Sequence, residues 1–127
     1  MTALNRLSRR ERQIMDAIYE MGSATVQEVL DHLDDPPSYS AVRALMRILE
    51  EKGALTHRQD GPRYMYLPTT PREEVRRSAL NHLVSTFFDG SMADTVATLL
   101  DIRDGELSEE EFLHLQQLID RAKKEGR

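Results

Sequence analysis

Apolar residues recur at helical spacing in the first part of the chain, and each apolar segment follows a capping signal. Ser8 with Glu11 has the spacing of a capping box, and Gly22 is typical of a helix end. Thr25 with Glu28 repeats the signal, and the two prolines of "DDPPS" must end the helix that follows. The pattern predicts two helices, whose apolar positions are Ile14, Met15, Ile18 and Met21, then Val26, Val29, Leu30 and Leu33.

A third helix is predicted from Ser38, which can cap it, to Gly53. Its residues separate into two stripes at helical spacing. The apolar stripe, expected to face a core, consists of Val42, Leu45, Met46 and Leu49. The opposite stripe consists of Ser40, Arg43, Ala44 and Arg47. The outer face of this helix therefore carries long cations separated by small residues.

The segment "ALTHRQDGPRYMYLP" alternates as strands do on either side of a turn signal, Asp60-Gly61-Pro62. Its alternating residues are Leu55, His57, Tyr64 and Tyr66. The pattern predicts a two-stranded hairpin whose tip carries Arg58 and Arg63. We expect the alternating residues to divide between the core and the hairpin surface.

Beyond Pro68 and Pro71, the sequence predicts helices only, so we place a domain boundary near residues 68–72. The first of three further helices is closed by Asp89-Gly90, and the last is capped by Ser108 with Glu111. The fold class expected is mainly α with a small β-hairpin.

About 55 residues make a thin core for an autonomous domain. We therefore expect residues 1–70 and 71–127 to form two domains, the second burying its apolar faces against another copy of the chain. The candidate dimerisation residues are Leu80, Leu83, Val84, Phe87, Phe88, Val96, Leu99, Leu100, Phe112, Leu115, Leu118 and Ile119.

Composition narrows the classes of function. The chain has no cysteine, which excludes disulfides, thiolate catalysis and cysteine-based metal sites. No apolar run approaches the ~18–20 residues that span a bilayer, and no secretory signal is recognised, so a cytoplasmic location is expected. The formal net charge is -5, and residues 1–70 hold nine Lys/Arg against ten acids. Nucleic-acid binding must therefore be argued from where the cations lie.

The order of three helices and a hairpin is that of a winged helix-turn-helix. A major groove, ~12 Å wide, admits one helix, and arginines such as Arg43 and Arg47 can bind guanine through two hydrogen bonds. Phosphate or minor-groove contacts are expected from Ser38, Tyr39, Arg58 and Arg63. A pair of arginines on an isolated helix is more often a solvated face, and it is the order of turn, striped helix and hairpin that favours DNA.

Two groups of polar residues could suggest a metal site. They are His32 with Asp31, Asp34 and Asp35, and His82 and His114 with Glu109, Glu110 and Glu111. Neither has a recognised ligand spacing, and helix capping and a solvated acidic face explain them better. No nucleophile–base pair or glycine-rich phosphate loop is found. We expect no metal, no cofactor and no enzyme activity.

Three segments, "LSRRERQIMDAIYEMGSATVQEVLDHL", "SYSAVRALMRILEEKGAL" and "RQDGPRYMYLP", resemble the penicillinase-repressor family of bacterial transcription regulators, the BlaI/MecI/CopY group. The resemblance extends from Leu7 to about Ile119 and is most specific up to Pro68. It implies a winged-helix DNA-binding domain, a three-helix dimerisation domain, and a homodimeric repressor on a palindromic operator with TACA and TGTA half-sites.

The resemblance also implies roles for individual residues. By position, the recognition helix contains Ser38, Tyr39, Ser40, Arg43, Ala44 and Arg47, and the wing contains Arg58, Gly61 and Arg63. Arg9 is a further candidate DNA contact. Ala44 stands where many family members have threonine, so one hydroxyl contact is absent.

The residues that serve regulation in two branches of the family are not found at the corresponding positions of this chain. The copper-sensing branch uses a C-terminal cysteine cluster, which this chain lacks, so copper control is not expected. In the beta-lactam branch a membrane sensor protease triggers cleavage of an Asn-Phe bond, and the aligned residues here are Thr98 and Leu99. Derepression by proteolysis, or by a signal-dependent loss of dimerisation, is the regulation that the resemblance implies.

Two other classes of function remain open on sequence. A winged helix can be a protein-interaction module without sequence-specific DNA binding, and a cleft beside it could hold a small molecule or metal. A DNA reader should bind with a salt dependence of about -0.9 per phosphate contact in log–log form, which an interaction module has no reason to show.

Overall fold

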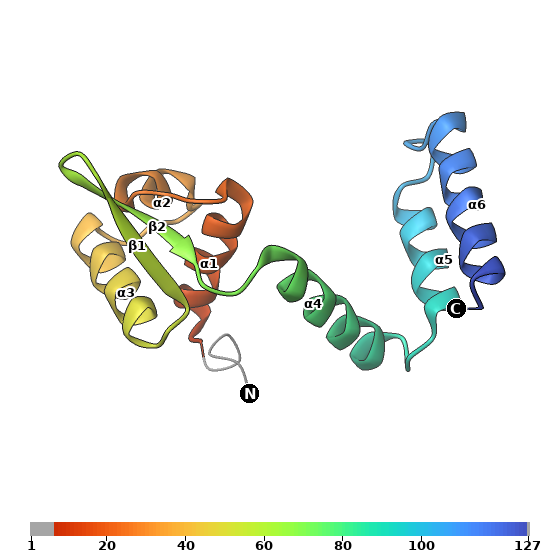
Figure 1. Ribbon diagram of the computed structural model, residues 1–127, viewed down its shortest axis with the longest axis horizontal. Helices are drawn as coiled ribbons and strands as arrows, with labels where there is room; N and C mark the ends of the chain where they lie inside the picture. The colour runs from red at the N-terminus through yellow and green to blue at the C-terminus, as the bar shows by residue number, and fades with distance from the viewer. Residues whose placement is uncertain (1–6, 127) are drawn as a thin grey trace. The chain divides into compact units, whose positions relative to one another are not determined.

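The computed structural model describes residues 7–126, which form six helices and two strands (Figure 1). The elements in chain order are α1 (Arg9–Met21), α2 (Val26–His32), α3 (Tyr39–Glu51), β1 (Leu55–Asp60), β2 (Arg63–Pro68), α4 (Arg72–Phe87), α5 (Met92–Ile102) and α6 (Glu109–Lys124). None of the described helices is long and apolar enough to cross a bilayer. The mainly α fold with one hairpin is as predicted.

The chain divides into two compact units, Met1–Ser78 and Ala79–Arg127. The division falls within α4, since that helix is continuous from Arg72 to Phe87. The domain limits expected from sequence, residues 1–70 and 71–127, remain a prediction.

Both predicted capping boxes of the first unit are present. The Ser8 hydroxyl accepts from the Glu11 N–H at 3.2 Å, while the Ser8 N–H donates to Glu11 Oε1 at 2.8 Å. Thr25 and Glu28 exchange the same two bonds at 3.1 and 2.9 Å. One boundary differs from the prediction: α2 ends at His32, because Leu33 has an extended backbone and forms the C-cap.

The third helix is capped as predicted, with the Ser38 hydroxyl accepting from the Ala41 N–H at 3.2 Å. Three of its four predicted core residues, Val42, Met46 and Leu49, are fully buried, and Leu45 is half-buried. All members of the opposite stripe are exposed. The two-stripe pattern of this helix is therefore confirmed.

The hairpin is antiparallel, with Asp60 paired to Arg63, so its turn consists of Gly61 and Pro62 alone. Arg63 begins β2 beside the turn. The prediction that the tip also carries Arg58 was wrong, because Arg58 lies within β1 opposite Met65. A segment not predicted as a strand adds to the sheet: Ala24 forms an isolated bridge with Tyr66, with backbone bonds of 3.0 and 2.8 Å.

One hydrophobic core joins these elements in the first unit. Tyr66 belongs to it, whereas Tyr64 is 47% exposed, so the two tyrosines divide as expected. The buried apolar residues are Ile14, Met15, Ala17, Ile18, Ala24, Val26, Val29, Val42, Met46, Leu49, Ala54, Leu55 and Tyr66. The core thus holds α1, α2, α3 and the base of the hairpin together, the arrangement of a winged helix.

The second unit contains the end of α4, then α5 and α6. Ser91 caps α5, and Ser108 with Glu111 forms the predicted capping box of α6. Phe88, expected within the preceding helix, lies just after its last residue, Phe87. Thr95 is the one buried residue among positions 79–126. This unit therefore has helices but no apolar core within a single chain.

Candidate nucleic-acid interface

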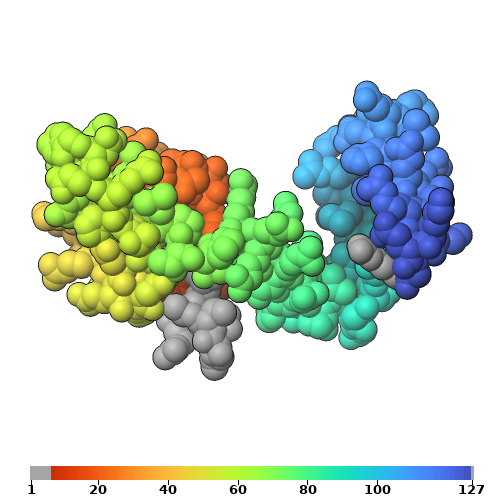
Figure 2. Space-filling view, viewed as in Figure 1, coloured from red at the N-terminus to blue at the C-terminus, as the bar shows by residue number. Residues whose placement is uncertain are grey.

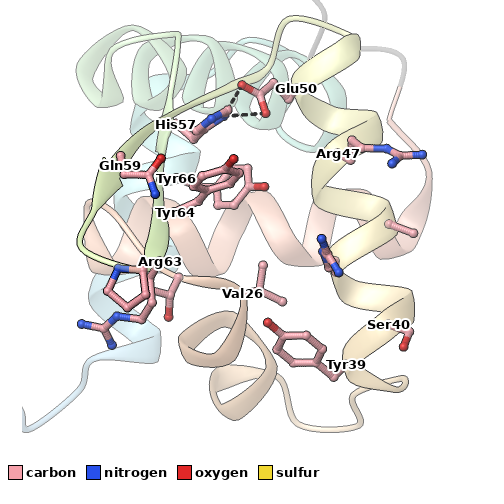
Figure 3. Close-up of a pocket in the computed structure, with 14 residues that line it drawn as sticks. Val26, Tyr39, Ser40, Arg47, Glu50, His57, Gln59, Arg63, Tyr64 and Tyr66 are labelled. Carbon is pink, nitrogen blue, oxygen red and sulfur yellow. Dashed lines mark hydrogen bonds and ion pairs between the residues drawn. The ribbon is translucent and has the colours of Figure 1, made fainter.

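A groove of about 720 Å³ lies between α3 and the hairpin. Figure 2 shows these two elements side by side on one face of the first unit, and Figure 3 shows the side chains between them. The groove is lined by Thr25, Val26, Tyr39, Ser40, Arg43, Ala44, Arg47, Glu50, His57, Gln59, Pro62, Arg63, Tyr64 and Tyr66. It contains every predicted recognition-helix residue except the cap, Ser38.

One wall of the groove is the outer stripe of α3. Tyr39, at the start of the helix, is 47% exposed, and its neighbour Ser40 is exposed as well. Arg43 and Arg47 follow along the same face, one turn apart, with the methyl group of Ala44 between them. A small side chain there lets another molecule approach the helix backbone closely.

The other wall is one face of the hairpin. In the strand register, His57 lies opposite Tyr66, and Gln59 lies opposite Tyr64, so these four side chains share a face. The His57 and Tyr64 rings are stacked, with centroids 4.3 Å apart and planes 22° from parallel. Figure 3 shows Arg63 on the hairpin wall and Arg47 on the α3 wall.

The arginines of the groove are largely unneutralised. Among residues 7–126, Arg43 and Arg63 form no ion pair, and Arg47 Nε reaches Glu51 Oε1 only at 4.0 Å. Both members of that distant pair are mostly exposed. Such a contact contributes little. All three guanidinium groups can therefore bind an anion supplied from outside.

The base of the groove is aromatic and partly buried. Burial raises the pKa of the Tyr66 hydroxyl, the Glu50 charge raises it further, and Arg43 acts in the opposite direction. Tyr66 therefore keeps its proton at neutral pH and can donate a hydrogen bond.

Sequence reasoning missed the contact that connects the two walls. Glu50, in the last turn of α3, lies 2.6 and 2.9 Å from His57 Nδ1 through its two carboxylate oxygens. The only signal in the sequence is an acid in the last turn of a helix, followed by a histidine in the next strand. That spacing does not predict a contact between Glu50 and His57 unless the conformation of the turn between them is known.

Some predicted contacts lie away from the groove. Arg58 projects from the opposite face of the hairpin, because it alternates with His57 and Gln59. Arg9, at the start of α1, lines a different groove together with Asp16, Glu20 and other residues of α1 and the α2–α3 loop. Gly61 occupies the turn with φ +64°.

The polar groups considered for metal binding do not converge in the described part of the chain. No three His, Asp or Glu side chains there form a group that could hold a metal ion. His32 Nε2 instead lies 2.7 Å from Glu20 Oε2, and Glu111 caps α6.

Three helices, a hairpin beside the third helix and an arginine-lined groove between them define the winged-helix class of DNA-binding domains. The chain belongs to the penicillinase repressor family, whose sequence model matches residues 7–121. As a member of that family it is a DNA-binding transcriptional repressor.

Comparison with individual proteins agrees with this assignment. The penicillinase repressor of Bacillus licheniformis is 24% identical over 125 residues, which cover 97% of this chain and 96% of that protein. Two solved structures share the fold. A MarR protein from Peptoclostridium difficile has a TM-score of 0.51 at 15% identity, covering 95% of this chain and 71% of its own. MepR, a transcription regulator of the Staphylococcus aureus multidrug efflux pump MepA, has a TM-score of 0.50 at 17% identity, covering 97% and 82%.

Proposed function

We propose that the groove between α3 and the hairpin binds operator DNA, with α3 as the recognition helix in the major groove. The observation that carries this proposal is the placement of Arg43, Arg47 and Arg63 around one groove in a chain whose net charge is -5. Glu50 is the single acid among the lining residues. Local cation density, and not overall charge, makes this surface attractive to phosphate.

The two arginines of α3 are proposed to contact base edges. An arginine side chain donates two parallel hydrogen bonds to guanine, and the one-turn spacing of Arg43 and Arg47 lets them reach neighbouring positions. Ala44 between them suits contact with a thymine methyl group. Ser38, Tyr39 and Ser40, at the start of the helix, are proposed to bind backbone phosphate, where the helix dipole is favourable.

The hairpin is proposed to bind DNA beside the recognition helix. Arg63 supplies the charge, and Gly61 lets the turn approach the backbone without a side chain. Arg58 and Arg9 are weaker candidates, because neither lines the groove. They are proposed to contact phosphates that flank a bound site.

Arg63 and Arg58 offer a matched test of the hairpin's role. Arg63→Ala is expected to weaken DNA binding by about tenfold and to reduce the log–log salt slope by about 1. Arg58→Ala removes the same charge from a residue of the same hairpin that does not line the groove, so a smaller loss is expected. Fluorescence anisotropy over a salt series measures both, and equal losses would contradict the proposal that DNA is bound in this groove.

A homodimer is the proposed active form. Large apolar side chains of the second unit are exposed to an extent unusual for a monomer, including Phe87 at 74%, Met92 at 76% and Ile119 at 58%. A second copy of the chain presents the same surface and can bury it. The proposed dimerisation residues are the twelve apolar positions predicted from sequence on α4, α5 and α6 and in the α4–α5 loop.

The proposed operator is a dyad of TACA and TGTA half-sites, one bound by each winged unit. Anisotropy on a duplex with this dyad, beside a scrambled duplex, tests the proposal at low and physiological salt. Preference of about 10³-fold for the dyad is expected. Equal, weak and salt-sensitive binding to both duplexes would contradict this operator, and binding without a salt dependence would favour a protein-interaction module.

Derepression is proposed to act through loss of the dimer. Two linked half-site contacts gain roughly 10²–10⁴ in affinity over one, so separating the winged units releases DNA without altering the groove. A sensor protease that cuts between Thr98 and Leu99 is one route. Both residues lie within α5, so the helix must unwind locally before the bond can enter a protease site.

A further inference from the structure

The carboxylate of Glu50 and the imidazole of His57 bridge the two walls of the groove. Glu50 Oε2 lies 2.6 Å from His57 Nδ1, and the side chains are 30% and 33% exposed (Figure 3). Because an ionised carboxylate can only accept hydrogen bonds, His57 must donate from Nδ1. Both the neutral Nδ1–H form and the imidazolium can do so, and in either case the ring orientation is set by Glu50.

The hairpin is held from two sides at the level of this bridge. His57 is paired in register with Tyr66, whose backbone exchanges two hydrogen bonds with Ala24. The ring of Tyr64, also from β2, stacks on the His57 ring. One side chain of β1 therefore connects α3 to both strands.

Glu50 lies on the same face of α3 as the arginines proposed to bind DNA. Glu50 follows Arg43 by seven residues and Arg47 by three, so the three side chains share a helix face. The bridge is about 10 Å along the helix axis from Arg43. A link at this point sets the distance between the arginines and the hairpin.

We propose that Glu50 and His57 are a positioning pair, which fixes the width of the groove before DNA enters. This inference rests on the proposed DNA-binding function. An acid among the arginines of such a groove repels phosphate, which is a cost that a purely electrostatic surface would avoid. The gain is preorganisation, because a hairpin already in place loses less freedom on binding.

The test compares two substitutions in the full-length chain that remove the same charge from neighbouring positions. Glu50→Gln removes the bridging carboxylate, whereas Glu51→Gln removes an exposed acid outside the groove lining, whose 4.0 Å contact with Arg47 Nε contributes little. Anisotropy on the dyad and scrambled duplexes measures both. Glu51→Gln is expected to bind slightly more tightly to both duplexes, since one repulsive charge is gone.

Glu50→Gln is expected to lose preference for the dyad by about threefold for each winged unit, and so about tenfold for a dimer. His57→Ala should show the same loss, and His57→Asn should restore part of it, because asparagine keeps an N–H donor near the position of Nδ1. Equal behaviour of Glu50→Gln and Glu51→Gln would overturn the proposal, and so would equal losses for the two His57 variants.

A measurement without DNA separates this proposal from the proposed function. The ¹⁵N chemical shifts of the His57 ring in the intact protein report which nitrogen carries the proton. A protonated Nδ1 in the wild type, altered in Glu50→Gln, is expected. An unprotonated Nδ1 in the wild type would contradict the proposed Glu50–His57 hydrogen bond even if the protein binds the dyad. A protein with the hydrogen bond but without preference for the dyad would contradict the proposed operator alone.

Discussion

Glu11 shows how one side chain can serve two structural roles in the first unit. Its Oε1 atom accepts from the Ser8 N–H at 2.8 Å and from Lys52 Nζ at 3.0 Å, so it caps α1 and connects that helix to the residue that ends α3. The residue is 3% exposed. Burial by itself raises the pKa of Glu11, but the bonds from Ser8 and the Lys52 charge outweigh it, and the pKa lies below its ordinary value.

The lowered pKa of Glu11 predicts acid sensitivity of the first unit. The unfolded chain binds the proton more readily, so the stabilisation by this carboxylate is present above the ordinary glutamate pKa and is lost as the pH falls through the folded-state value. Glu11→Gln is expected to lower the free energy of unfolding by about 2 kcal/mol at neutral pH. It should also make the free energy of unfolding depend less on pH on the acid side, called here the acid limb. Urea unfolding at a series of pH values, followed by circular dichroism, measures both effects.

Glu28 supplies the control for that experiment. It completes the capping box at Thr25 as Glu11 does at Ser8, but it is exposed and pairs with no cation among the described residues. Glu28→Gln should lower stability slightly and leave the acid limb as in the wild type. A Glu11→Gln variant with an unchanged acid limb would assign the sensitivity to another carboxylate.

At the scale of the elements, the junction between α3 and β1 decides where the hairpin begins. Gly53 has φ +84° in this junction, and its carbonyl accepts from the Thr69 hydroxyl at 2.6 Å. A Cβ built there meets no atom within 4 Å, so space is not the constraint. The constraint is the left-handed backbone, because it brings the Cβ of an L-residue too close to the following carbonyl oxygen.

Gly53→Ala is therefore expected to destabilise the first unit by about 1 kcal/mol, and Gly53→Asn by less, since asparagine tolerates this conformation. Denaturant unfolding monitored by circular dichroism measures the difference. A larger cost for Gly53→Asn than for Gly53→Ala would indicate a side-chain clash, in conflict with the open space around this position.

At the scale of the whole molecule, the second unit lacks a core that one chain can complete. Ile119 is 58% exposed on α6, and Gln117 lies on the opposite face of the same helix. Substitution of either residue by glutamate adds the same negative charge to α6. The pair therefore distinguishes burial of the apolar face from a general effect of charge on α6.

Ile119→Glu is expected to convert a dimer into monomers and to weaken dyad binding by roughly 10²–10⁴, with the first unit still folded. Gln117→Glu should remain dimeric and keep wild-type affinity. Light scattering after size exclusion gives the mass of each variant, and anisotropy gives the affinity. A wild-type protein that is monomeric at the concentrations that bind DNA would contradict the proposed dimer.

The sequence by itself determined the helices and where most of them begin, because the capping signals depend on residues a few positions apart. The capping pairs Ser8–Glu11, Thr25–Glu28 and Ser108–Glu111 each span one helical turn, and all are formed as predicted. The same is true of the stripe of Arg43 and Arg47, since the period of the helix fixes which side chains share a face. Membership of the repressor family could also be recognised from these segments.

Only the tertiary structure decided which side chains form the groove. Arg63, beside the turn, lines the groove and Arg58 does not, although the strand register puts both on the hairpin face opposite His57; the turn after α3 brings Glu50 to His57. Contacts such as Lys52 with Glu11, 41 residues apart, form only when α1 and α3 pack on the common core. Local spacing encodes local hydrogen bonds, whereas these contacts depend on how whole elements bury their apolar faces against one another.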